Sequence, residues 1–517
     1  MTGFAISDIQ NSINELEAEL LLLEALNSAN GRVEASWPVA PVPRNIELPL
    51  SFSQQGLWVL DQLKLIGPAY NISAALRITG DLRLRILERS FDEIIRRHEI
   101  LRTTFSETTQ SPVQKIAPNL DLPLTLIDLS RSRSEHLETE IHRLITEEAG
   151  SRFDLTRGPL LRVTVLRLSP HEHIIVIVMH HIISDGWSMG VLLSEVSALY
   201  TTYSVGLASP LPELPIQYAD YAYWERQRFQ AGALSVDQDY WVRRIGSTPP
   251  VVDLPTDRCR PALPTFRGAI HFFKLPLGLS NGIDSLSMKE GVTPFMVLAA
   301  SLQALLYYHT SQSDIIMGTD VANRGDIKTE KLIGLFVNQL ALRVNISESF
   351  TFRDLLNQVR EAALGAYEHQ AYPFYKLVEE LTPKRDGSRS PLFQIKLVLQ
   401  NAPMPALEIR GLALTRVPLD TGTAKFELLM NLWKLPEGLT GALEYNGDLF
   451  DASTISRFVE EYETVLMRVI AQPEIMISRL KEVLAESRRK QRRLDRNRRE
   501  ESNYKKLKNA KPQRLIY

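Results

Sequence analysis

The sequence has a single cysteine, Cys259, among its 517 residues. An internal disulfide is therefore excluded, and a chain of this kind fits the reducing cytoplasm. Cys259 lies in the stretch TDRCRPALP, whose prolines and charges indicate a surface loop. We therefore do not expect this thiol to act as a nucleophile.

Long apolar runs and a strong net charge are also missing. No apolar run approaches the roughly 18 residues that a membrane-spanning helix needs. The N-terminal MTGFAISDIQ lacks the basic start and apolar core of a secretion signal. The formal net charge is −2, so the body of the protein offers no excess of basic residues for a polyanion. We expect a soluble cytoplasmic protein that binds neither a membrane nor a nucleic acid.

The length exceeds what one hydrophobic core supports, at roughly 150 residues per domain. Predicted helices and strands alternate in both halves, which is typical of mixed α/β folds. We predict two α/β lobes over residues 46–225 and 226–482. A helix with a proline-rich linker would precede them over residues 1–45, and a basic tail would follow over residues 483–517.

Both ends differ from the body in composition. Between Ile6 and Leu23, apolar residues recur at alternating spacings of three and four, which predicts a helix that packs on its own body or docks on a partner. The tail from Ser487 to Tyr517 has 13 basic residues against three acidic ones, but it lacks the interleaved aromatics of a base-stacking surface. We interpret it as a linker or docking segment.

The stretch HEHIIVIVMHHIISDGWSMG, residues 171–190, combines a strong strand signal with polar residues. The apolar, β-branched run from Ile174 to Met179 predicts a buried strand that ends at His180 and His181. Because side chains alternate along a strand, we expect one histidine to face a cleft and the other to brace the fold.

Further elements follow from the same kind of pattern. A helix over residues 187–200 is expected after the histidines, and its free N–H groups would favour a developing oxyanion. His98 and Glu99 are interpreted as a charged helix end rather than as catalytic residues. The other expected helices cover residues 50–63, capped by Ser51 or Ser53, and 82–98, and one starts at Thr293-Pro294; the expected strands cover 160–168, 314–318 and 393–399.

Three chemistries could use residues 171–190. Metal binding by His181 and Asp185 lacks a third ligand at a motif spacing. Serine hydrolysis would use Ser188 in G-x-S-x-G, but in a nucleophile elbow the serine directly follows a strand, whereas eight residues separate Met179 from Ser188 here. Acyl transfer would use His181 on an incoming nucleophile, with Asp185 bracing the turn through an arginine and Gly186 allowing the backbone to approach the substrate closely.

HHIISDGWS, residues 180–188, resembles the HHxxxDG signature of the condensation domains of nonribosomal peptide synthetases, which are relatives of chloramphenicol acetyltransferase. The resemblance covers roughly residues 46–480, and by its seven motifs the chain is identified as a member of this family. The six further motifs, in the order of the family, are LSFSQQGLWVL (50–60), RRHEILRTTF (96–105), YADYAYW (218–224), IGLFVNQLALR (333–343), HQAYPF (369–374) and RDGSRSPL (385–392).

Four positions depart from the family pattern. Gly56 stands where the first motif usually has Arg, Gln339 where the fifth usually has Thr, and Ala371 and Tyr375 replace acidic residues common in the sixth. Because the signature residues are all present, we expect activity, and we expect the departures to affect substrate preference. His180 excludes the heterocyclising subtype, which has Asp there, and the sequence is most similar to subtypes that join two L-configured residues.

The resemblance implies two acetyltransferase-like lobes that form a V-shaped pseudo-dimer with a central tunnel. It implies transfer of a donor acyl or peptidyl group from a carrier-protein thioester to the amine of an aminoacyl group on an acceptor carrier, forming an amide. The 4'-phosphopantetheine arms belong to the carriers, so we expect this chain to bind no cofactor and no metal of its own. Other synthetase modules are further possible partners of the N-terminal helix or the basic tail.

The resemblance also implies roles for individual residues. His181 accepts a hydrogen bond or a proton from the acceptor amine, two roles that the sequence does not separate. His180 braces the loop, and Asp185 forms a structural ion pair with Arg102 by family analogy, or otherwise with Arg343. The residues expected to line the site are Gly186, Trp187, Ser188 and, from the second lobe, Asn338.

Two other functions stay open at this point. One is an acyltransferase that uses a soluble amine or alcohol, or a coenzyme A thioester; the DFGWG motif of its plant-type branch is absent. The other is a catalytically silent scaffold that only recruits carriers, against which the retention of His181 and Asp185 argues.

Overall fold

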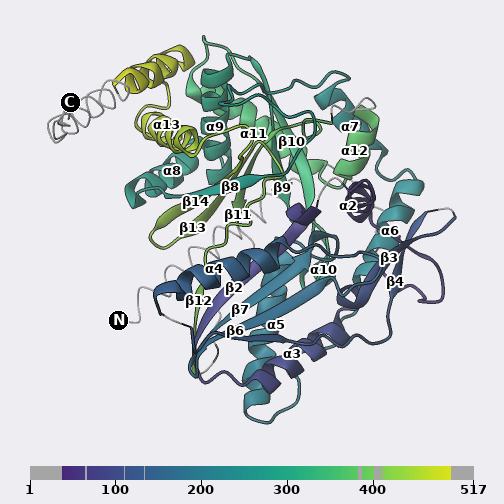
Figure 1. Cartoon of the computed structure of the whole chain (residues 1–517). Coiled ribbons are helices and arrows are strands. Elements are labelled where there is room, and N and C mark those ends of the chain that lie inside the picture. The colour runs from purple at the N-terminus through teal and green to yellow at the C-terminus, as the bar shows by residue number, and fades with distance from the viewer. Residues whose placement is uncertain are drawn as a thin grey trace, which may run out of the picture.

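The computed structural model describes residues 38–490 apart from 65–66, 110, 133, 382–386, 401–408 and 410. The helix expected between Ile6 and Leu23, residues 491–517 of the tail and the start of RDGSRSPL lie outside the described residues. The described chain forms two lobes, each a β-sheet with packed helices, so the predicted mixed α/β architecture is confirmed (Figure 1).

The first lobe is built on a five-stranded sheet of order β12-β2-β7-β6-β5. Its strands are β2 (Asn71–Gly80), β5 (Thr125–Asp128), β6 (Leu161–Ser169), β7 (Glu172–His180) and β12 (Leu412–Arg416). β6 and β7 form an antiparallel hairpin, as expected from the sequence. A small sheet of order β1-β4-β3 completes the lobe, with β1 (Leu48–Pro49), β3 (Thr103–Glu107) and β4 (Pro112–Ile116).

Strand β7 is buried on both faces. Ile174 and Val176 pack in the cluster on the side of α4, while Ile175 and Ile177 join the larger cluster with α3 and α5. The helices of this lobe are α2 (Phe52–Gln62), α3 (Leu84–Arg97), α4 (Ser134–Gly150), α5 (Gly186–Ser204) and α6 (Tyr218–Gln230), and its 3₁₀ turns are η1 (Gly67–Tyr70), η2 (Glu99–Arg102) and η3 (His181–Ile183). Burial on both faces explains the continuous apolar run that predicted this strand.

The second lobe has a six-stranded sheet of order β10-β9-β11-β13-β14-β8. The strands are β8 (Gly268–Lys274), β9 (Asp314–Val321), β10 (Asn338–Asn345), β11 (Ile395–Gln400), β13 (Leu428–Leu435) and β14 (Gly438–Asn446). The helices are α7 (Ser235–Ile245), α8 (Leu277–Glu290), α9 (Pro294–Thr310), α11 (Phe352–Glu368), α12 (Phe374–Leu381) and α13 (Ala452–Ala471), and residues 477–490 are also helical. The short helix α10 (Ile327–Glu330) lies against the first lobe instead (Figure 1).

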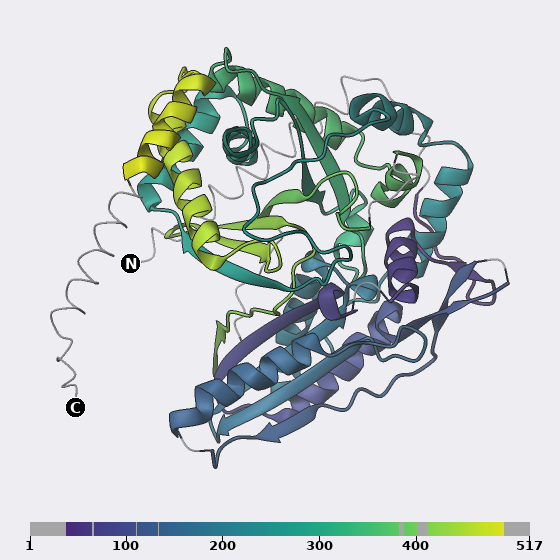
Figure 2. The same cartoon turned by 45° about the horizontal axis from the view of Figure 1, so that its top comes forward.

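One face of this second sheet is turned towards the first lobe. Helices α8, α9, α11 and α13 pack on the side away from it, as Figures 1 and 2 show. Along β13, buried Leu428 and Met430 alternate with partly exposed Leu429 and Asn431. The partly exposed set therefore lies on the face between the lobes.

Two helix starts follow the signals expected from the sequence. Ser51 caps α2 and forms a capping box with Gln54, whose side chain accepts the Ser51 backbone N–H. Thr293 caps α9, and Pro294 occupies its first turn. Among the described residues no single helix is long and apolar enough to cross a membrane, and α8 and α9 pass that test only together, as a pair bent by 104°.

Two segments from the second half of the chain belong to the first lobe. β12 extends the first sheet by pairing with β2, and residues 332–336 place Leu332, Ile333, Leu335 and Phe336 in the core of the first lobe. A single boundary at residue 225 therefore separates the lobes only in part. These crossings bring second-half residues against the turn that follows β7.

Gly334 illustrates how closely the crossing segment packs. A Cβ atom at this position would lie 2.0 Å from Cδ2 of Tyr218, a buried side chain of α6. We predict that Gly334→Ala lowers the free energy of unfolding by about 1–3 kcal/mol, because the ring or the backbone must move. Gly278→Ala is the matched control, because a Cβ there meets open space and alanine favours helix. Denaturant unfolding of both variants checks this, and equal stabilities would contradict it.

Candidate functional site

The site is the turn between β7 and α5. The strand ends at His180, the 3₁₀ turn His181–Ile183 follows, and α5 begins at Gly186 with Asp185 as its N-cap. The loop is held against α2 because the Gln54 side chain donates to the Ile182 carbonyl. The end of the strand and the start of the helix thus place both histidines, the aspartate and the glycine within one short turn.

His181 is the partly exposed histidine of this turn. Its Nδ1 lies 2.7 Å from the Ser184 carbonyl oxygen. Because a carbonyl only accepts, Nδ1 carries the hydrogen, and Nε2 of the neutral ring is an acceptor. Burial lowers the pKa of His181 well below its ordinary value, and the Lys425 cation lowers it further, while the Ser184 carbonyl and Asp185 oppose the shift. The ring therefore stays neutral near pH 7.

His180 faces the interior. Only 2% of its surface is exposed, its Nδ1 accepts the Ile182 backbone N–H at 3.1 Å, and its ring meets Phe153 edge-on. Burial lowers the pKa of His180 to about 3, helped by His181 and Lys425. The histidine buried against the fold is thus His180, and the histidine open to a ligand is His181.

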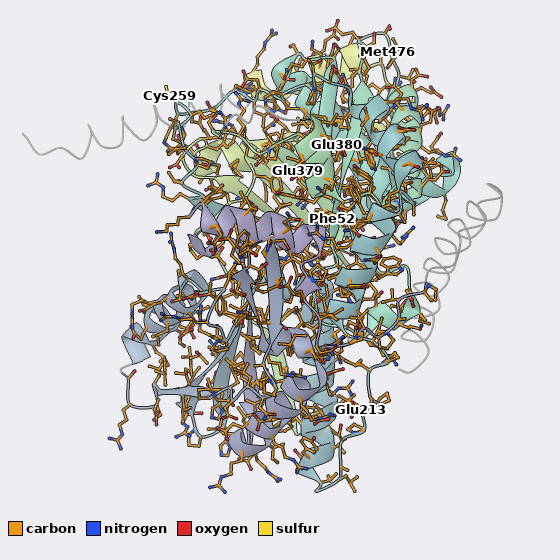
Figure 3. All side chains as sticks on the ribbon, turned by 90° about the vertical axis from the view of Figure 1, so that its right-hand side faces the viewer. Phe52, Glu213, Cys259, Glu379, Glu380 and Met476 are labelled. Carbon is orange, nitrogen blue, oxygen red and sulfur yellow. The ribbon has the colours of Figure 1, made fainter. Side chains whose placement is uncertain are left out.

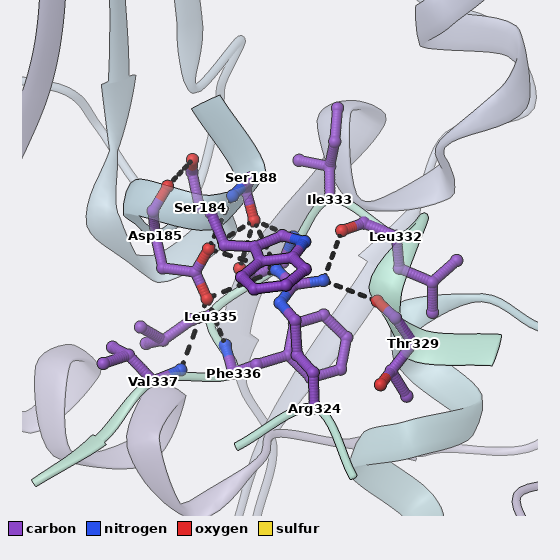
Figure 4. Close-up of polar contacts among 12 residues, drawn as sticks. Ser184, Asp185, Ser188, Arg324, Thr329, Leu332, Ile333, Leu335, Phe336 and Val337 are labelled. Atoms are coloured by element: carbon purple, nitrogen blue, oxygen red, sulfur yellow. Dashed lines mark hydrogen bonds and ion pairs between the residues drawn. The ribbon is translucent and has the colours of Figure 1, made fainter. Parts of the chain in front are cut away.

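Asp185 is buried and fully engaged (Figure 4). One carboxylate oxygen accepts the Ser188 N–H at 2.8 Å and lies 2.7 Å from the Ser188 hydroxyl. The other accepts the backbone N–H groups of Phe336 and Val337 at 3.0 and 3.3 Å. A carboxylate of the first lobe thereby fixes the crossing segment of the second half.

The cation that pairs with Asp185 is Arg324, from the loop between β9 and α10. Its Nη2 lies 3.1 Å from Asp185 Oδ1, and Nη1 donates to the carbonyls of Thr329 and Leu332. Burial lowers the pKa of Arg324, and Asp185 opposes that shift. The guanidinium also stacks on the Phe336 ring, with its carbon 4.1 Å from the ring centroid.

The two ion pairs predicted for Asp185, with Arg102 or with Arg343, are both wrong. Arg102 donates to the Ala117 carbonyl and lies 3.9 Å from Glu99, and Arg343 pairs with Asp314 across the β9–β10 ladder. Arg343 lies opposite Ile316 in the ladder, and Asp314 is two residues away on the same face of β9, within reach of the guanidinium. No sequence spacing singles out Arg324, because its contact with Asp185 spans 139 residues.

Ser188 and Asn338 are corrected from lining residues to structural ones. The Ser188 hydroxyl is fully buried and lies within hydrogen-bond distance of Asp185, Arg324 and the Gly334 backbone. The Asn338 amide donates to the carbonyls of Gln370 and Tyr372, and its oxygen accepts the Phe374 N–H. These contacts occupy the polar atoms of both side chains, so neither is available to a substrate.

The glycine and the tryptophan of the motif lie differently. Gly186 is exposed, and a Cβ there would meet nothing within 4 Å among the described residues, so the site has open space beside its backbone. Trp187 is partly exposed, and its indole N–H donates to the Glu330 carbonyl at 2.9 Å. Both residues therefore lie at the surface of the turn.

The alternative chemistries lose their geometric basis. Across the ranges that the structure describes, no group of three His, Cys, Asp or Glu side chains could hold a metal ion. Ser188 is enclosed and points at a carboxylate, so it has no access to a substrate. His98 is buried against Glu195 at 3.0 Å, and Glu99 binds Arg44, which agrees with their interpretation as structural residues.

Two residues near His181 were not expected from the sequence. Tyr70, in η1, has its ring centroid 6.3 Å from that of His181, and burial raises the pKa of its hydroxyl to about 12. Lys425 precedes β13 in the second lobe, with its ammonium 4.8 Å from the centroid of the Tyr70 ring. Neither residue stands out in the sequence. They lie near His181 only because the two lobes pack together.

Two of the residues that depart from the family pattern, Gly56 and Tyr375, are in contact where α2 packs against α12. A Cβ at Gly56 would lie 2.8 Å from Cδ2 of Tyr375, so the small residue makes room for the ring. Figure 3 shows this junction from the side, with Phe52 of α2 close to Glu379 and Glu380 of α12. The two substitutions therefore form one packing feature between the lobes.

We predict that Arg324→Met lowers the free energy of unfolding by about 3–5 kcal/mol, because it leaves the Asp185 charge buried without its cation. The control is Arg343→Met, which removes a partly exposed pair with Asp314 and is expected to cost at most about 1 kcal/mol. Chemical denaturation measures both. Similar losses for the two variants would argue against the assigned pair.

The lowered pKa of His180 predicts a pH dependence of stability. Below about pH 6.5 the unfolded chain binds a proton at His180 that the folded chain does not bind. The free energy of unfolding therefore falls as the pH falls, by at most about 1.4 kcal/mol per pH unit for this residue. In His180→Asn, which keeps an acceptor for the Ile182 N–H, we expect a shallower decrease between pH 6.5 and 5. Identical slopes would contradict the assignment.

Comparison with known proteins identifies the family of this chain. The family model described as "Condensation domain" matches residues 45–491. One linear gramicidin synthase polypeptide from Brevibacillus parabrevis is 44% identical over 442 residues, which is 85% of this chain and 6% of that protein. The chain thus spans a small part of the length of this relative.

Solved structures show the same fold. The X-domain from teicoplanin biosynthesis superposes with a TM-score of 0.78 at 28% identity, covering 85% of this chain and 99% of the X-domain. The complex of the X-domain and OxyB gives a TM-score of 0.77 at 29% identity, covering 86% of this chain and 97% of that one. From its family match, its motifs and its fold, this chain belongs to the condensation-domain family of nonribosomal peptide synthetases.

Proposed function

We propose that this chain forms amide bonds by moving an acyl or peptidyl group from a donor carrier thioester to the amine of an acceptor aminoacyl carrier. The observation that carries the proposal is the state of His181. Its Nδ1 is held by the Ser184 carbonyl, its ring is kept neutral, and its Nε2 has no partner in the described part of the chain. A partly exposed ring nitrogen with a free lone pair suits an incoming amine.

The other residues of the turn would support this histidine. His180 and Asp185 fix the backbone on either side of it, through the Ile182 N–H and the crossing segment. The open space beside Gly186 would let the acceptor group approach, and Trp187 would border its path. The catalytic contribution of Asp185 is thus indirect, through the position of His181.

The proposed mechanism asks the site mainly to position its substrates, and substrates that arrive tethered to carrier proteins suit such a site. The donor and acceptor would each arrive on the 4'-phosphopantetheine arm of a carrier protein, and this chain would hold no arm itself. Orienting an amine against a thioester can supply several kcal/mol of the barrier through effective molarity. A positioned acceptor nitrogen on His181 is what such a reaction needs from the protein.

A second candidate is a domain that binds protein partners without catalysis. It is favoured by one observation, the solved complex of the similar X-domain with OxyB. The two candidates differ in what His181 does, because a scaffold does not need a free imidazole nitrogen. A variant of this residue therefore separates them.

We predict that His181→Ala abolishes amide formation while leaving the thermal unfolding midpoint nearly unchanged, since the ring is partly exposed. The assay combines the protein with acyl-loaded donor carriers and aminoacyl-loaded acceptor carriers, and intact mass spectrometry reads the gain of the donor group. His171→Ala, in the exposed turn of the same hairpin, is the matched control and should keep the wild-type rate. Carrier binding without any mass gain by the wild type, across a panel of acyl and aminoacyl groups, would favour the scaffold.

A further inference from the structure

A cation of the second lobe and His181 both lie next to Tyr70. Lys425 belongs to the segment that returns from β12 to β13, and its ammonium is 4.8 Å from the centroid of the Tyr70 ring. The Tyr70 ring centroid lies in turn 6.3 Å from that of His181. The three side chains come from three separate segments, and Tyr70 lies next to both of the others.

The ammonium of Lys425 is largely enclosed but lacks the ion pair that an enclosed cation usually has. Throughout the ranges that the structure describes, Nζ has no hydrogen bond or ion pair, although the side chain is only partly exposed. Neighbouring Lys396 is paired with Asp320, and the Glu444 carboxylate accepts the backbone N–H of Lys425 at 3.0 Å. Enclosed cations are normally paired, so an ammonium that contacts the Tyr70 ring and has no ion pair with a described carboxylate has capacity for an anionic ligand atom.

Two other positive groups of the site are engaged with Asp185. The N-terminus of α5 was expected to favour an oxyanion, but its Asp185 cap accepts the Ser188 N–H and neutralises that end of the helix. Arg324 is buried, its Nη1 and Nη2 contact two carbonyls, Asp185 and Ser188, and its Nε is enclosed without a partner among the described residues. Lys425 is the cation that lowers the pKa of His181, and its ammonium has no ion pair among the described residues.

We propose that Lys425 is a further catalytic residue, whose ammonium binds the oxygen that becomes negative when an amine held by His181 attacks the donor thioester. This role rests on the proposed function. The amine nitrogen forms a bond to the carbonyl carbon, and the π electron pair moves to the oxygen facing Lys425. Collapse restores the carbonyl and breaks the carbon–sulfur bond, and the proton lost by the amine ends on the leaving thiolate.

Three variants test this role in single-turnover transfer between loaded carriers. Lys425→Met removes the charge at similar volume and should slow transfer about 100-fold to 1000-fold, the usual effect of losing one oxyanion donor, with carrier KM unchanged. Lys425→Arg keeps the charge and should recover part of the rate. Lys434→Met, a partly exposed lysine of β13 that pairs with Asp284, should behave as wild type.

The pH dependence of the transfer rate separates a catalytic role of Lys425 from a structural one, because a purely structural residue would not change that dependence. Burial lowers the pKa of Lys425 to about 8, with Lys396 acting in the same direction and Glu444 and Asp320 opposing it. The active ammonium is therefore lost as the pH rises through about 8, whereas arginine stays charged. The ratio of the wild-type rate to the Lys425→Arg rate should fall above this pH.

A measurement independent of activity separates this role from the proposed function. Histidine NMR should show that Lys425→Met raises the pKa of His181, because a nearby positive charge has been removed. A wild-type transfer rate in Lys425→Met, or a slow variant whose His181 titration is unchanged, would overturn the role of Lys425. A wild type that never transfers would overturn the proposed function, and the catalytic role of Lys425 with it.

Discussion

The buried contact between Asp185 and the segment that contains Arg324, Phe336 and Val337 is the constraint on which the site depends. Two charges with exposures of 2% and 8% are removed from water, and the cost is offset because every carboxylate oxygen has several donors. The contact joins a turn of the first lobe to a segment from the second half of the chain. It therefore fixes the backbone on the C-terminal side of His181 and ties the two lobes together at the same point.

The chemistry of His181 follows from that rigidity. Its tautomer is set by a carbonyl within its own turn, so the position of the turn decides which ring nitrogen carries the hydrogen. Burial and Lys425 keep the ring neutral, which favours a hydrogen-bond acceptor over a residue that stores a proton. The opposing lobe contributes through Lys425, so the electrostatics of the site depend on how the lobes meet.

Much of this arrangement could be predicted from the sequence, for reasons that are local. The apolar run from Ile174 to Met179 predicts the strand, and the Thr293-Pro294 pair predicts the start of a helix. The signature motif predicts the turn that contains the two histidines. The partner of Asp185 could not be predicted, because Arg324 is one of 59 basic residues and only the crossing of the lobes selects it. Ser188 and Asn338 were misjudged for a related reason, since a polar residue near a site lines it only if other protein groups leave its hydrogen bonds free.

The proposed role of His181 is tested most directly by ¹⁵N NMR of its ring, with and without an acceptor carrier that bears a non-transferable aminoacyl analogue. We predict a neutral ring protonated at Nδ1 in the free protein, with the Nε2 resonance moving to that of a hydrogen-bonded acceptor when the loaded carrier binds. A ring protonated at Nε2, or an Nε2 resonance that ignores the loaded carrier, would contradict the central claim that this histidine holds the acceptor amine.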